Sequence, residues 1–465
     1  MPPGLPGAAG RRSTGIGGMV TTPRPITVLG RKVRETLRTS LYRNAAYLVL
    51  TSGLNSLSGF VFWAVAARIY PVEGVGLASA AISAMGLLAL LSTLGMDYSL
   101  IRFLPGSGDR GNDILSSCLT LGGLVSVVLT VVFLAGIHWW SPALLRIQQN
   151  PVFFASFTLF ALASVLKVFT ERTFVAARRA GLALVQGLLF GLLRFVPLLA
   201  LAPLFDVFGI FASWGIALSL AVAVGIPFLL PRVRPGYCPV PRLHLRAVGS
   251  MMRFSFANYA ANIMWAIPVL GLPVLVVNRL GAEANAYFYV GWALGYLLVN
   301  IPVTVSLSLF AEGSNAGEHL ARNIARSLKL LLLLVPVIAI FFLVGDEVLA
   351  LFGSAYADNA TSLLWVLAVS ALPVGVNHTF FALRRIQGKM RDVVGLSVFI
   401  TAGTMVGSYF LLPRLGIVGV GLGWLVPQAI AAAVVMPGLL RYRHGSAAEA
   451  VPQTESVYHQ EPMAG

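Results

Sequence analysis

Four charged residues lie inside long apolar stretches of this sequence, where a charge is costly. Lys167 and Glu171 are four positions apart, so on a helix they share a face and can pair. Arg194 has no acidic residue near it in the sequence, and Asp97 lies near the end of its stretch. A charge at the centre of a membrane costs about 3 kcal/mol on insertion scales. These residues are therefore the first candidates for binding an anion or coupling to an ion.

Each of these charges also has a simpler explanation. Lys167 can extend to the membrane surface while paired with Glu171, and Arg194 can anchor to lipid phosphate. Asp97 can be an ordinary helix-end acid. We take Arg194 as the main candidate for an anion site, keep Lys167 as a second cation, and treat Asp97 and Glu171 as candidates for proton or sodium coupling.

The composition identifies the surroundings of these charges as a membrane. Of the 465 residues, 57% are hydrophobic and only 11% are charged, and the mean hydropathy is +0.83, which excludes a set of soluble domains. The two cysteines, Cys118 and Cys238, give no disulfide framework. The six histidines show no metal-binding spacing. We therefore expect an all-α integral membrane protein with no cofactor or metal.

The chain offers twelve apolar stretches long enough to cross a bilayer, which needs about 20 residues per helix. They lie at 44–66, 76–98, 114–137, 152–172, 182–203, 207–230, 252–277, 284–308, 325–345, 362–383, 393–412 and 417–440. An even number of crossings puts both termini on one side. Residues 1–43 contain no apolar segment of the signal-peptide kind and are expected to be a disordered basic tail. Within it, 31–43 is either an amphipathic surface helix or a plain charged lead-in.

The basic residues predict the orientation of these segments. On the twelve-segment topology, 27 of the 33 Lys and Arg residues fall in the tails and loops on the side of the termini. The opposite loops hold only Arg68, Arg146, Arg279 and Arg414. By the positive-inside rule both termini are cytosolic. The net charge of +16 is then an orientation signal and an attraction to anionic lipid, and not a nucleic-acid site.

The two halves of the sequence repeat each other. The stretch Thr173–Arg179 reads TFVAARR and Thr379–Arg385 reads TFFALRR, with five of seven positions identical at an offset of 206. Arg68 corresponds to Arg279 at an offset of 211, and Trp214 to Trp424 at 210. Composition alone explains repeated Leu, Val or Ala, but not a repeated basic motif at equivalent helix ends.

This repeat predicts two six-helix bundles, related by a pseudo-twofold axis along the membrane normal, with a cavity between them. The expected organisation is a tail (1–43), an N-terminal bundle (44–230), a basic linker (231–251), a C-terminal bundle (252–440) and a second tail (441–465). Two such bundles indicate transport by alternating access. Major facilitator transporters share the six-plus-six pattern, but the loop LPGSGDRGND lacks the trailing arginines of their signature.

The first hundred residues carry a more specific pattern. An Asn- and Ser-rich helix (NAAYLVLTSGLNSLSGFVFWAVAAR) is followed by RIYPVEGVG and by a long apolar stretch ending LSTLGMDYSLIRFLP. This pattern resembles the polysaccharide transport family of the multidrug/oligosaccharidyl-lipid/polysaccharide exporter superfamily, the flippases of lipid-linked and O-antigen-type oligosaccharides that serve lipopolysaccharide synthesis. The basic ARR exit at 177–179 and the run GIVGVGLGW extend the resemblance over nearly the whole chain. Tyr70 departs from the Leu-Gly pair that is common in the family, which leaves the geometry of this turn open.

The resemblance implies a flippase in a bacterial-type cytoplasmic membrane that moves a polyprenyl-phosphate-linked oligosaccharide or similar anionic glycolipid. Such a headgroup needs cations for phosphate, amides and hydroxyls for sugar, and aromatic faces for sugar rings. Three helix faces offer these groups, besides Arg68 and Arg279: Thr51, Asn55 and Ser58; Asn258, Asn262 and Trp265; and Tyr289, Trp292 and Tyr296. The alternative for these faces is bonding between helices and aromatic packing at the membrane surface.

Two other functions compete with flipping. A drug or cation antiporter of the same superfamily would bury several carboxylates, and the candidates here are Asp97 and Glu171. A membrane glycosyltransferase or ligase would place acids or histidines in a large outer loop, but His138 and His378 each stand alone. We expect a transporter and not an enzyme, with membrane lipids, glycan polymerase or glycosyltransferases as partners and no nucleic acid.

Overall fold

The computed structural model describes residues 40–202, 206–313 and 320–443, and these residues form helices joined by short turns. The predicted all-α membrane class is confirmed, since eleven helices are long and apolar enough to cross a membrane. The predicted tails lie almost entirely outside the described residues.

The N-terminal half runs from the first described helix to the basic linker. Its helices are α2 (Ser40–Ile69), α3 (Val72–Ser92), α4 (Met96–Phe103), α5 (Gly111–Ala135), α6 (Ile137–Trp140), α7 (Leu145–Gln149), α8 (Pro151–Ala176), α9 (Ala180–Leu193), α10 (Phe195–Leu201) and α11 (Asp206–Val224). Short helical turns lie at Gly108–Arg110, Pro142–Leu144, Gly225–Leu229 and Leu230–Arg232.

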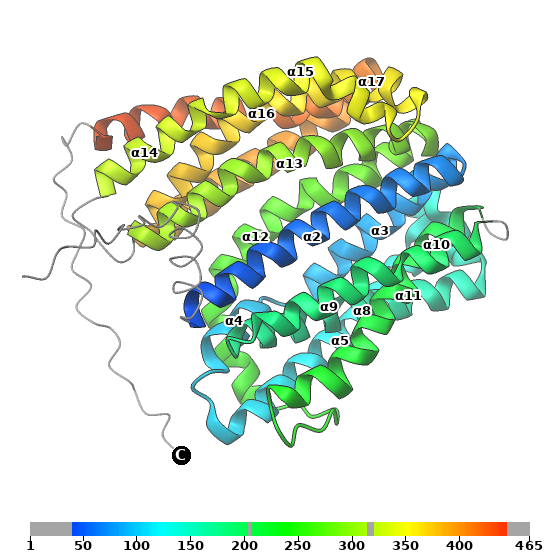
Figure 1. Cartoon of the computed structure of the whole chain (residues 1–465), viewed down its shortest axis with the longest axis vertical. Helices are drawn as coiled ribbons and strands as arrows, with labels where there is room; N and C mark the ends of the chain where they lie inside the picture. Colours follow the sequence, from blue (N-terminus) through cyan, green and yellow to red (C-terminus); the bar gives the residue numbers. More distant parts are fainter. Residues whose placement is uncertain (1–39, 203–205, 314–319, 444–465) are drawn as a thin grey trace, which may run out of the picture.

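The C-terminal half contains fewer and longer helices. They are α12 (Leu245–Leu280), α13 (Ala282–Gly313), α14 (Leu320–Leu332), α15 (Leu334–Ala350), α16 (Ser354–Ile386) and α17 (Met390–Arg443). In Figure 1 the helices of the C-terminal half lie together on one side of the molecule, and those of the N-terminal half lie on the other. The helices α3 and α12 lie where the two halves meet. The division into two bundles with the bounds given above stays a prediction.

The helix α17 is a hairpin of two helices. Its 54 residues would extend about 80 Å as one helix, far more than the 30 Å or so of a bilayer core. The backbone leaves the helical region at Gly416, with φ 58° and ψ −145°. Gly423 then packs against Ser408, and Gly403 against Pro427, so the second part folds back along the first. The eleven spans count α17 once; twelve crossings stay a prediction.

One predicted segment ends earlier than expected. The stretch 76–98 was predicted as a single helix, but α3 ends at Ser92. Leu94 and Gly95 both have positive φ, 50° and 76°, and such left-handed residues terminate a helix. Asp97 therefore lies in the separate helix α4, beyond the end of the membrane span, and not inside it.

The two halves contact each other mainly through α3, which packs on α12 and α13. Gly76 allows the closest approach, since a Cβ there would lie 1.8 Å from the carbonyl oxygen of Ala282. Beside it, the Nδ2 of Asn285 donates to the Gly76 carbonyl at 2.7 Å and to the Ser79 hydroxyl at 3.1 Å. These bonds fix the start of α13 against the start of α3.

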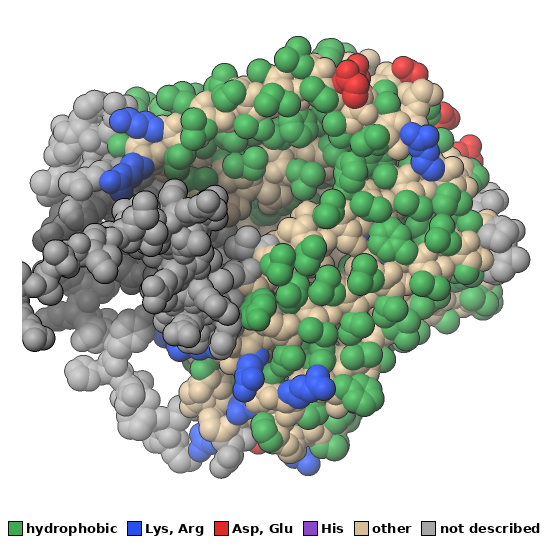
Figure 2. All heavy atoms as spheres, in the orientation of Figure 1, with side chains coloured by type: hydrophobic (Ala, Val, Ile, Leu, Met, Phe, Trp, Pro, Cys, Tyr) green, Lys and Arg blue, Asp and Glu red, His purple; other side chains and the backbone are tan. Residues whose placement is uncertain are grey.

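Charge is distributed along the long axis of the helices. The beginning of α2 and the end of α17 lie at the same end of the molecule (Figure 1). On the face shown in Figure 2, most Lys and Arg side chains lie toward that end, most Asp and Glu side chains toward the other, and hydrophobic side chains cover the middle. This face therefore has a basic end and an acidic end separated by an apolar band, as is typical of a protein that crosses a membrane.

Candidate functional site

Arg194 lies at the break between α9 and α10 and is the most enclosed cation of the N-terminal half. It is only 2% exposed, and four aromatic rings surround its guanidinium. Its Cζ lies 4.8 Å from the ring centre of Phe62, 4.9 Å from Trp214, 5.2 Å from Phe190 and 5.9 Å from Phe195. Stacked aromatic faces stabilise a desolvated guanidinium by cation–π attraction. We call these four rings the aromatic box.

The hydrogen bonds of Arg194 leave it without a carboxylate. One terminal nitrogen donates to the Ser58 hydroxyl at 2.7 Å, and that hydroxyl donates to the Gly191 carbonyl at 2.7 Å. Its Nε is buried without a partner. Within the described part of the chain, no acidic side chain forms an ion pair with it. Arg194 thus has no acidic residue near it in the sequence and no ionic partner among the described acidic side chains.

Next to this box is a pocket between the two halves, which we call the inter-half pocket. It has a volume of about 220 Å³, and its lining includes Gly59, Trp63, Trp214, Tyr289, Leu294 and Phe352. Trp214 belongs both to this wall and to the aromatic box. A Cβ on Gly59 would lie 4.0 Å from the terminal nitrogen of Arg194, so Gly59 and Trp214 both line the pocket and lie close to the cation. The rings of Trp63 and Tyr289, one from each half, are 4.7 Å apart.

The polar face of α2 lies elsewhere than predicted. Thr51 and Asn55 pack against Gly187 of α9, where a Cβ would meet both at 3.3 Å. Ser58 contacts Gly191 and bonds to Arg194. We predicted that this face lines the cavity, but in this structure it forms the contact between α2 and α9. Because the two glycines have no side chain, the polar residues can approach that helix.

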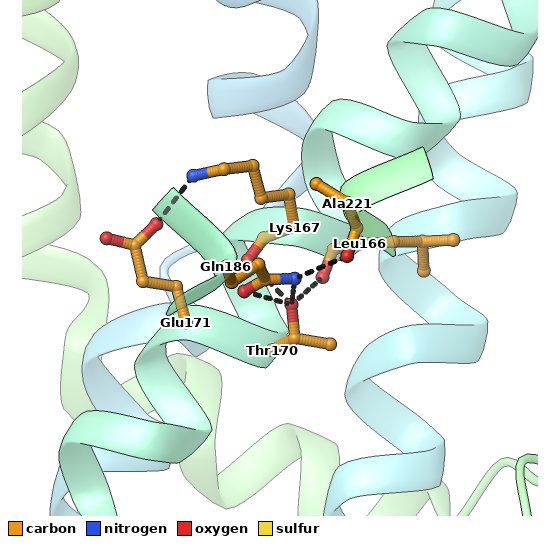
Figure 3. Close-up of polar contacts among 6 residues, drawn as sticks. All are labelled: Leu166, Lys167, Thr170, Glu171, Gln186 and Ala221. Atoms are coloured by element: carbon orange, nitrogen blue, oxygen red, sulfur yellow. Dashed lines mark hydrogen bonds and ion pairs between the residues drawn. The ribbon is translucent and has the colours of Figure 1, made fainter. Parts of the chain in front are cut away.

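Lys167 and Glu171 form the predicted ion pair on α8, at 2.9 Å. Figure 3 shows that the pair points away from a buried group formed by Thr170 and Gln186. The Gln186 amide donates to the Thr170 hydroxyl at 2.9 Å and to the Ala221 carbonyl at 3.3 Å, linking α8, α9 and α11. Lys167 also lies 5.6 Å from the ring of Phe190, a member of the aromatic box.

A second cavity lies in the C-terminal half, and we call it the C-terminal pocket. It has a volume of about 260 Å³ and is lined by residues of α12, α13, α16 and α17 and by one residue of α4. Its lining includes Asn262, Trp265, His378, Arg385, Thr401 and Tyr98. Two of the predicted site residues, Asn262 and Trp265, therefore line a cavity. The side chain of Asn258 lies outside the described residues.

The predicted aromatic face of α13 contributes to two different places. Tyr289 lines the inter-half pocket. Trp292 and Tyr296 belong to a cluster next to the C-terminal pocket: Trp292 lies 5.3 Å from Trp424, and the Tyr296 hydroxyl accepts a hydrogen bond from the Trp265 indole at 3.0 Å. In this structure Trp292 and Tyr296 support the wall of the C-terminal pocket from behind.

Asp97 is 3% exposed, although it lies beyond the membrane span. Its Oδ2 is 3.6 Å from the Nε of Arg172, and its Oδ1 is buried without a partner. Burial raises the pKa of Asp97 above its usual value, and Arg172 partly opposes this shift. Such a carboxyl takes up a proton more readily than an exposed one.

The two equivalent arginines Arg68 and Arg279 make different contacts. Arg68 donates from Nε to the Leu351 carbonyl at 3.0 Å and from a terminal nitrogen to the Ala350 carbonyl at 2.9 Å. It thus joins the end of α2 to the end of α15 in the other half. Arg279 lies 3.9 Å from the ring of Tyr409 in its own half. Neither lies in a pocket described above.

Several residues of these pockets were missed as site candidates. In the sequence His378 is a lone histidine, and Arg385 belongs to a basic helix exit. Trp214 was used only to align the two halves, although the repeat Trp214/Trp424 marks one residue of each pocket. The signal was therefore present in the repeat. It gave the positions but not the directions of the side chains.

Comparisons with known proteins agree with this architecture. A sequence model of the polysaccharide biosynthesis protein family matches residues 41–303, which is more than half of the chain. The protein therefore belongs to this family. No curated protein matches the chain.

Solved structures share the fold at low sequence identity. An inward-facing multidrug resistance MATE family transporter of the MOP superfamily is 18% identical, with a TM-score of 0.64 over 84% of this chain and 96% of that one. The inward closed lipid II flippase MurJ is 11% identical, with a TM-score of 0.68 over 86% and 90%. An outward-facing MATE transporter is 17% identical, with a TM-score of 0.58 over 87% and 95%.

Proposed function

We propose that the protein is a flippase that moves a polyprenyl-phosphate-linked oligosaccharide, or a similar anionic glycolipid, across the cytoplasmic membrane by alternating access. Membership of the polysaccharide biosynthesis protein family supports a glycan substrate. The fold shared with the lipid II flippase MurJ is compatible with moving a lipid. The substrate is transported without covalent change, so the protein is not an enzyme.

The observation that carries this proposal is the buried, unneutralised charge of Arg194. A buried charge without an ionic partner is costly, and four rings with one hydroxyl compensate for it only in part. A phosphate would pair with the guanidinium through two parallel hydrogen bonds. Movement of the Trp214 ring would bring the cation into the inter-half pocket, where the headgroup would bind between the halves.

Export of the glycan in living cells tests this role. In a strain lacking the native copy, the wild-type protein should restore surface glycan, and Arg194→Gln should reduce it to background at equal protein level. Arg194→Lys keeps the charge but loses the planar donor fork, so export should fall only in part. Arg414→Gln, which changes an exposed arginine, is the matched control. Full export by Arg194→Gln would exclude Arg194 from substrate binding.

The proposal includes an orientation with both ends of the chain in the cytosol, and accessibility to thiol reagents tests it. The native Cys238 is exposed in the basic linker, whereas Cys118 is buried. In intact cells, an impermeant maleimide should leave Cys238 unlabelled until the membrane is permeabilised. Asp358→Cys, at an exposed position in the first turns of α16, should label at once in a variant with Cys238→Ser. The reverse pattern would invert the topology.

A drug or cation antiporter is the alternative function, and Asp97 is the observation in its favour. It is buried with one oxygen unpartnered, as an ion-coupling acid would be, and the MATE transporters share the fold. In the strain described above, protection against cationic drugs that is lost in Asp97→Asn, without any change in surface glycan, would favour this alternative over the flippase.

A further inference from the structure

The C-terminal pocket contains a cation that the proposed function has not used. Arg384 and Arg385 are adjacent at the end of α16, but only Arg385 lines the pocket. Arg384 forms an ion pair with Asp392 at 3.2 Å, bonds to Gln387 and stacks on Phe380. Arg385 forms no ion pair with any described acidic residue, and its Nε is buried without a partner. The pocket therefore presents one charge that needs an anion.

The remaining lining of the pocket has the groups that bind sugars. The indole nitrogen of Trp265 is occupied by Tyr296, so Trp265 contributes an apolar ring surface and no free donor. Asn262 adds an amide, and the Nε2 of His378 is buried without a partner. Aromatic surface together with a few polar groups is the usual lining of a small-molecule site. The volume of about 260 Å³ is just below the range for drug-sized ligands, which suits a single sugar unit.

A lipid chain or water would fit this lining less well. An apolar chain would leave the Arg385 charge and the His378 nitrogen desolvated and unpaired, which is costly. Water would hydrate them but would leave the Trp265 surface exposed. A sugar with a negatively charged substituent satisfies all three: its ring packs on the indole, its anion pairs with the guanidinium, and a hydroxyl bonds to the His378 nitrogen.

The pocket is also completed by the other half. Tyr98 of α4 is its only lining residue from the N-terminal half among those described. A ligand in the pocket would therefore contact both halves while they are closed at this end. Separation of the halves would remove Tyr98 and open the pocket.

We propose that the C-terminal pocket binds an acidic sugar unit of the transported glycan, with its anionic group on Arg385 and its ring on Trp265. This inference rests on the proposed flippase function and specifies its substrate class. The lipid phosphate and the glycan then bind at separate places, at Arg194 in the N-terminal half and at Arg385 in the C-terminal half.

Binding of free sugars to the purified full-length protein tests this site. D-glucuronate is the probe, with D-glucose and inorganic phosphate at equal ionic strength for comparison. Tryptophan fluorescence and thermal shift report binding, because Trp265 and Trp424 line the pocket. We expect glucuronate to bind more tightly than either comparison ligand. Arg385→Gln should weaken its binding at least about tenfold, the scale of a charge-assisted pair, and Arg384→Gln should leave it within about twofold.

Each other outcome contradicts the proposal. Equal binding of glucose would remove the role of the anion, and equal binding of phosphate would remove the role of the sugar ring. Unchanged glucuronate binding in Arg385→Gln would place the site elsewhere. If Arg385→Gln does not fold, Arg385→Lys replaces it, with an expected loss of severalfold from the missing donor fork.

Flipping of a neutral-glycan polyprenyl lipid in proteoliposomes separates this inference from the proposed function. Flipping by the wild type without any glucuronate binding would overturn the acidic-sugar site and leave the flippase standing. Glucuronate binding that depends on Arg385, without flipping of any polyprenyl lipid, would overturn the flippase and keep the sugar site.

Discussion

Two tryptophans at corresponding positions of the two halves have different surroundings. Trp214 and Trp424 are 210 residues apart and occupy corresponding helices. Trp214 covers the guanidinium of Arg194, which is fully enclosed. Trp424 donates to the Ser370 hydroxyl at 3.1 Å and lines the C-terminal pocket. The N-terminal half therefore encloses its cation in aromatic rings, whereas the cation of the C-terminal half lines a pocket.

The end of the fourth helix in each half shows how this difference arises. In each half a residue with positive φ follows the end of this helix: Arg178 follows α8, and Gly388 follows α16. These two residues are also 210 positions apart. The two TFxAxRR motifs are 206 residues apart, whereas the two residues with positive φ are 210 apart. The motif therefore lies about one helical turn further from the positive-φ residue in α16 than in α8. Arg178 and Arg179 are exposed beyond the end of α8. Arg385 lies within α16 and lines the C-terminal pocket. The same motif therefore contributes surface charges in one half and a pocket residue in the other.

Removal of the two tryptophans should give the largest effects and should be unequal. Trp424 is 1% exposed, so Trp424→Ala should destabilise the protein by about 3 kcal/mol. Trp214→Ala should cost less, because Trp214 is only half-buried, but it should change export more by exposing Arg194 to the inter-half pocket. Thermal unfolding in detergent and surface glycan measure the two effects. Equal losses of stability and export in both variants would mean that the two sites do not differ as described.

The equivalent arginines Arg68 and Arg279 offer a second, smaller contrast. Arg68→Ala removes two hydrogen bonds to the end of α15 and thus the link between the halves. A loss of about 1 kcal/mol at this exposed contact would favour opening about fivefold. Arg279→Ala removes only a contact within one half. The measurement is the labelling rate of Ala293→Cys in the inter-half pocket, in a background without other cysteines, with an impermeant reagent added outside. Equal labelling rates in the two variants would argue against a role of Arg68 in holding the two halves together.

The architecture could be predicted from the sequence because apolar length and repeats determine it directly. The apolar stretches correspond to the helices, and α17 contains the last two of them, separated at Gly416. The helix end at Ser92 could not be predicted, because hydropathy continues past it. It depends on the backbone conformation of Leu94, a residue that rarely adopts positive φ.

The site residues were harder to predict because spacing gives a helix face but not its neighbour. Thr51 and Asn55 share a face as predicted, but that face meets α9 because Gly187 leaves room there. Arg194 could be identified from the sequence because no acidic residue lies near it. Its four aromatic neighbours could not, because they come from α2, α9, α10 and α11, which are far apart in the sequence. Arg385 differs from Arg384 only in the direction of its side chain, which the sequence does not contain.

Asp97 should give a moderate effect that depends on pH. Burial raises its pKa, so the folded state binds a proton more tightly than the unfolded state does. The folded state is therefore destabilised as pH rises from the ordinary value of 3.8 through the raised value. The melting temperature of the wild type should fall relative to that of Asp97→Asn as the pH rises above 3.8 and through the raised pKa of Asp97. A relative rise over this range would mean that the pairing with Arg172 outweighs burial.

The ion pair of Lys167 and Glu171 should contribute least to stability and export, although both charges lie in an apolar stretch of the sequence. Its side chains are 15% and 33% exposed, and an i, i+4 pair on a helix contributes about 0.5 kcal/mol or less. Glu171→Gln should therefore leave both export and unfolding nearly unchanged. The neighbouring Gln186 is fully buried and bonds to two other helices, so Gln186→Ala should cost about 1 to 3 kcal/mol by leaving those partners unpaired. If Glu171→Gln instead abolished export while Gln186→Ala did not, the pair itself would belong to the transport site, and the functional cation of the N-terminal half would be Lys167 and not Arg194.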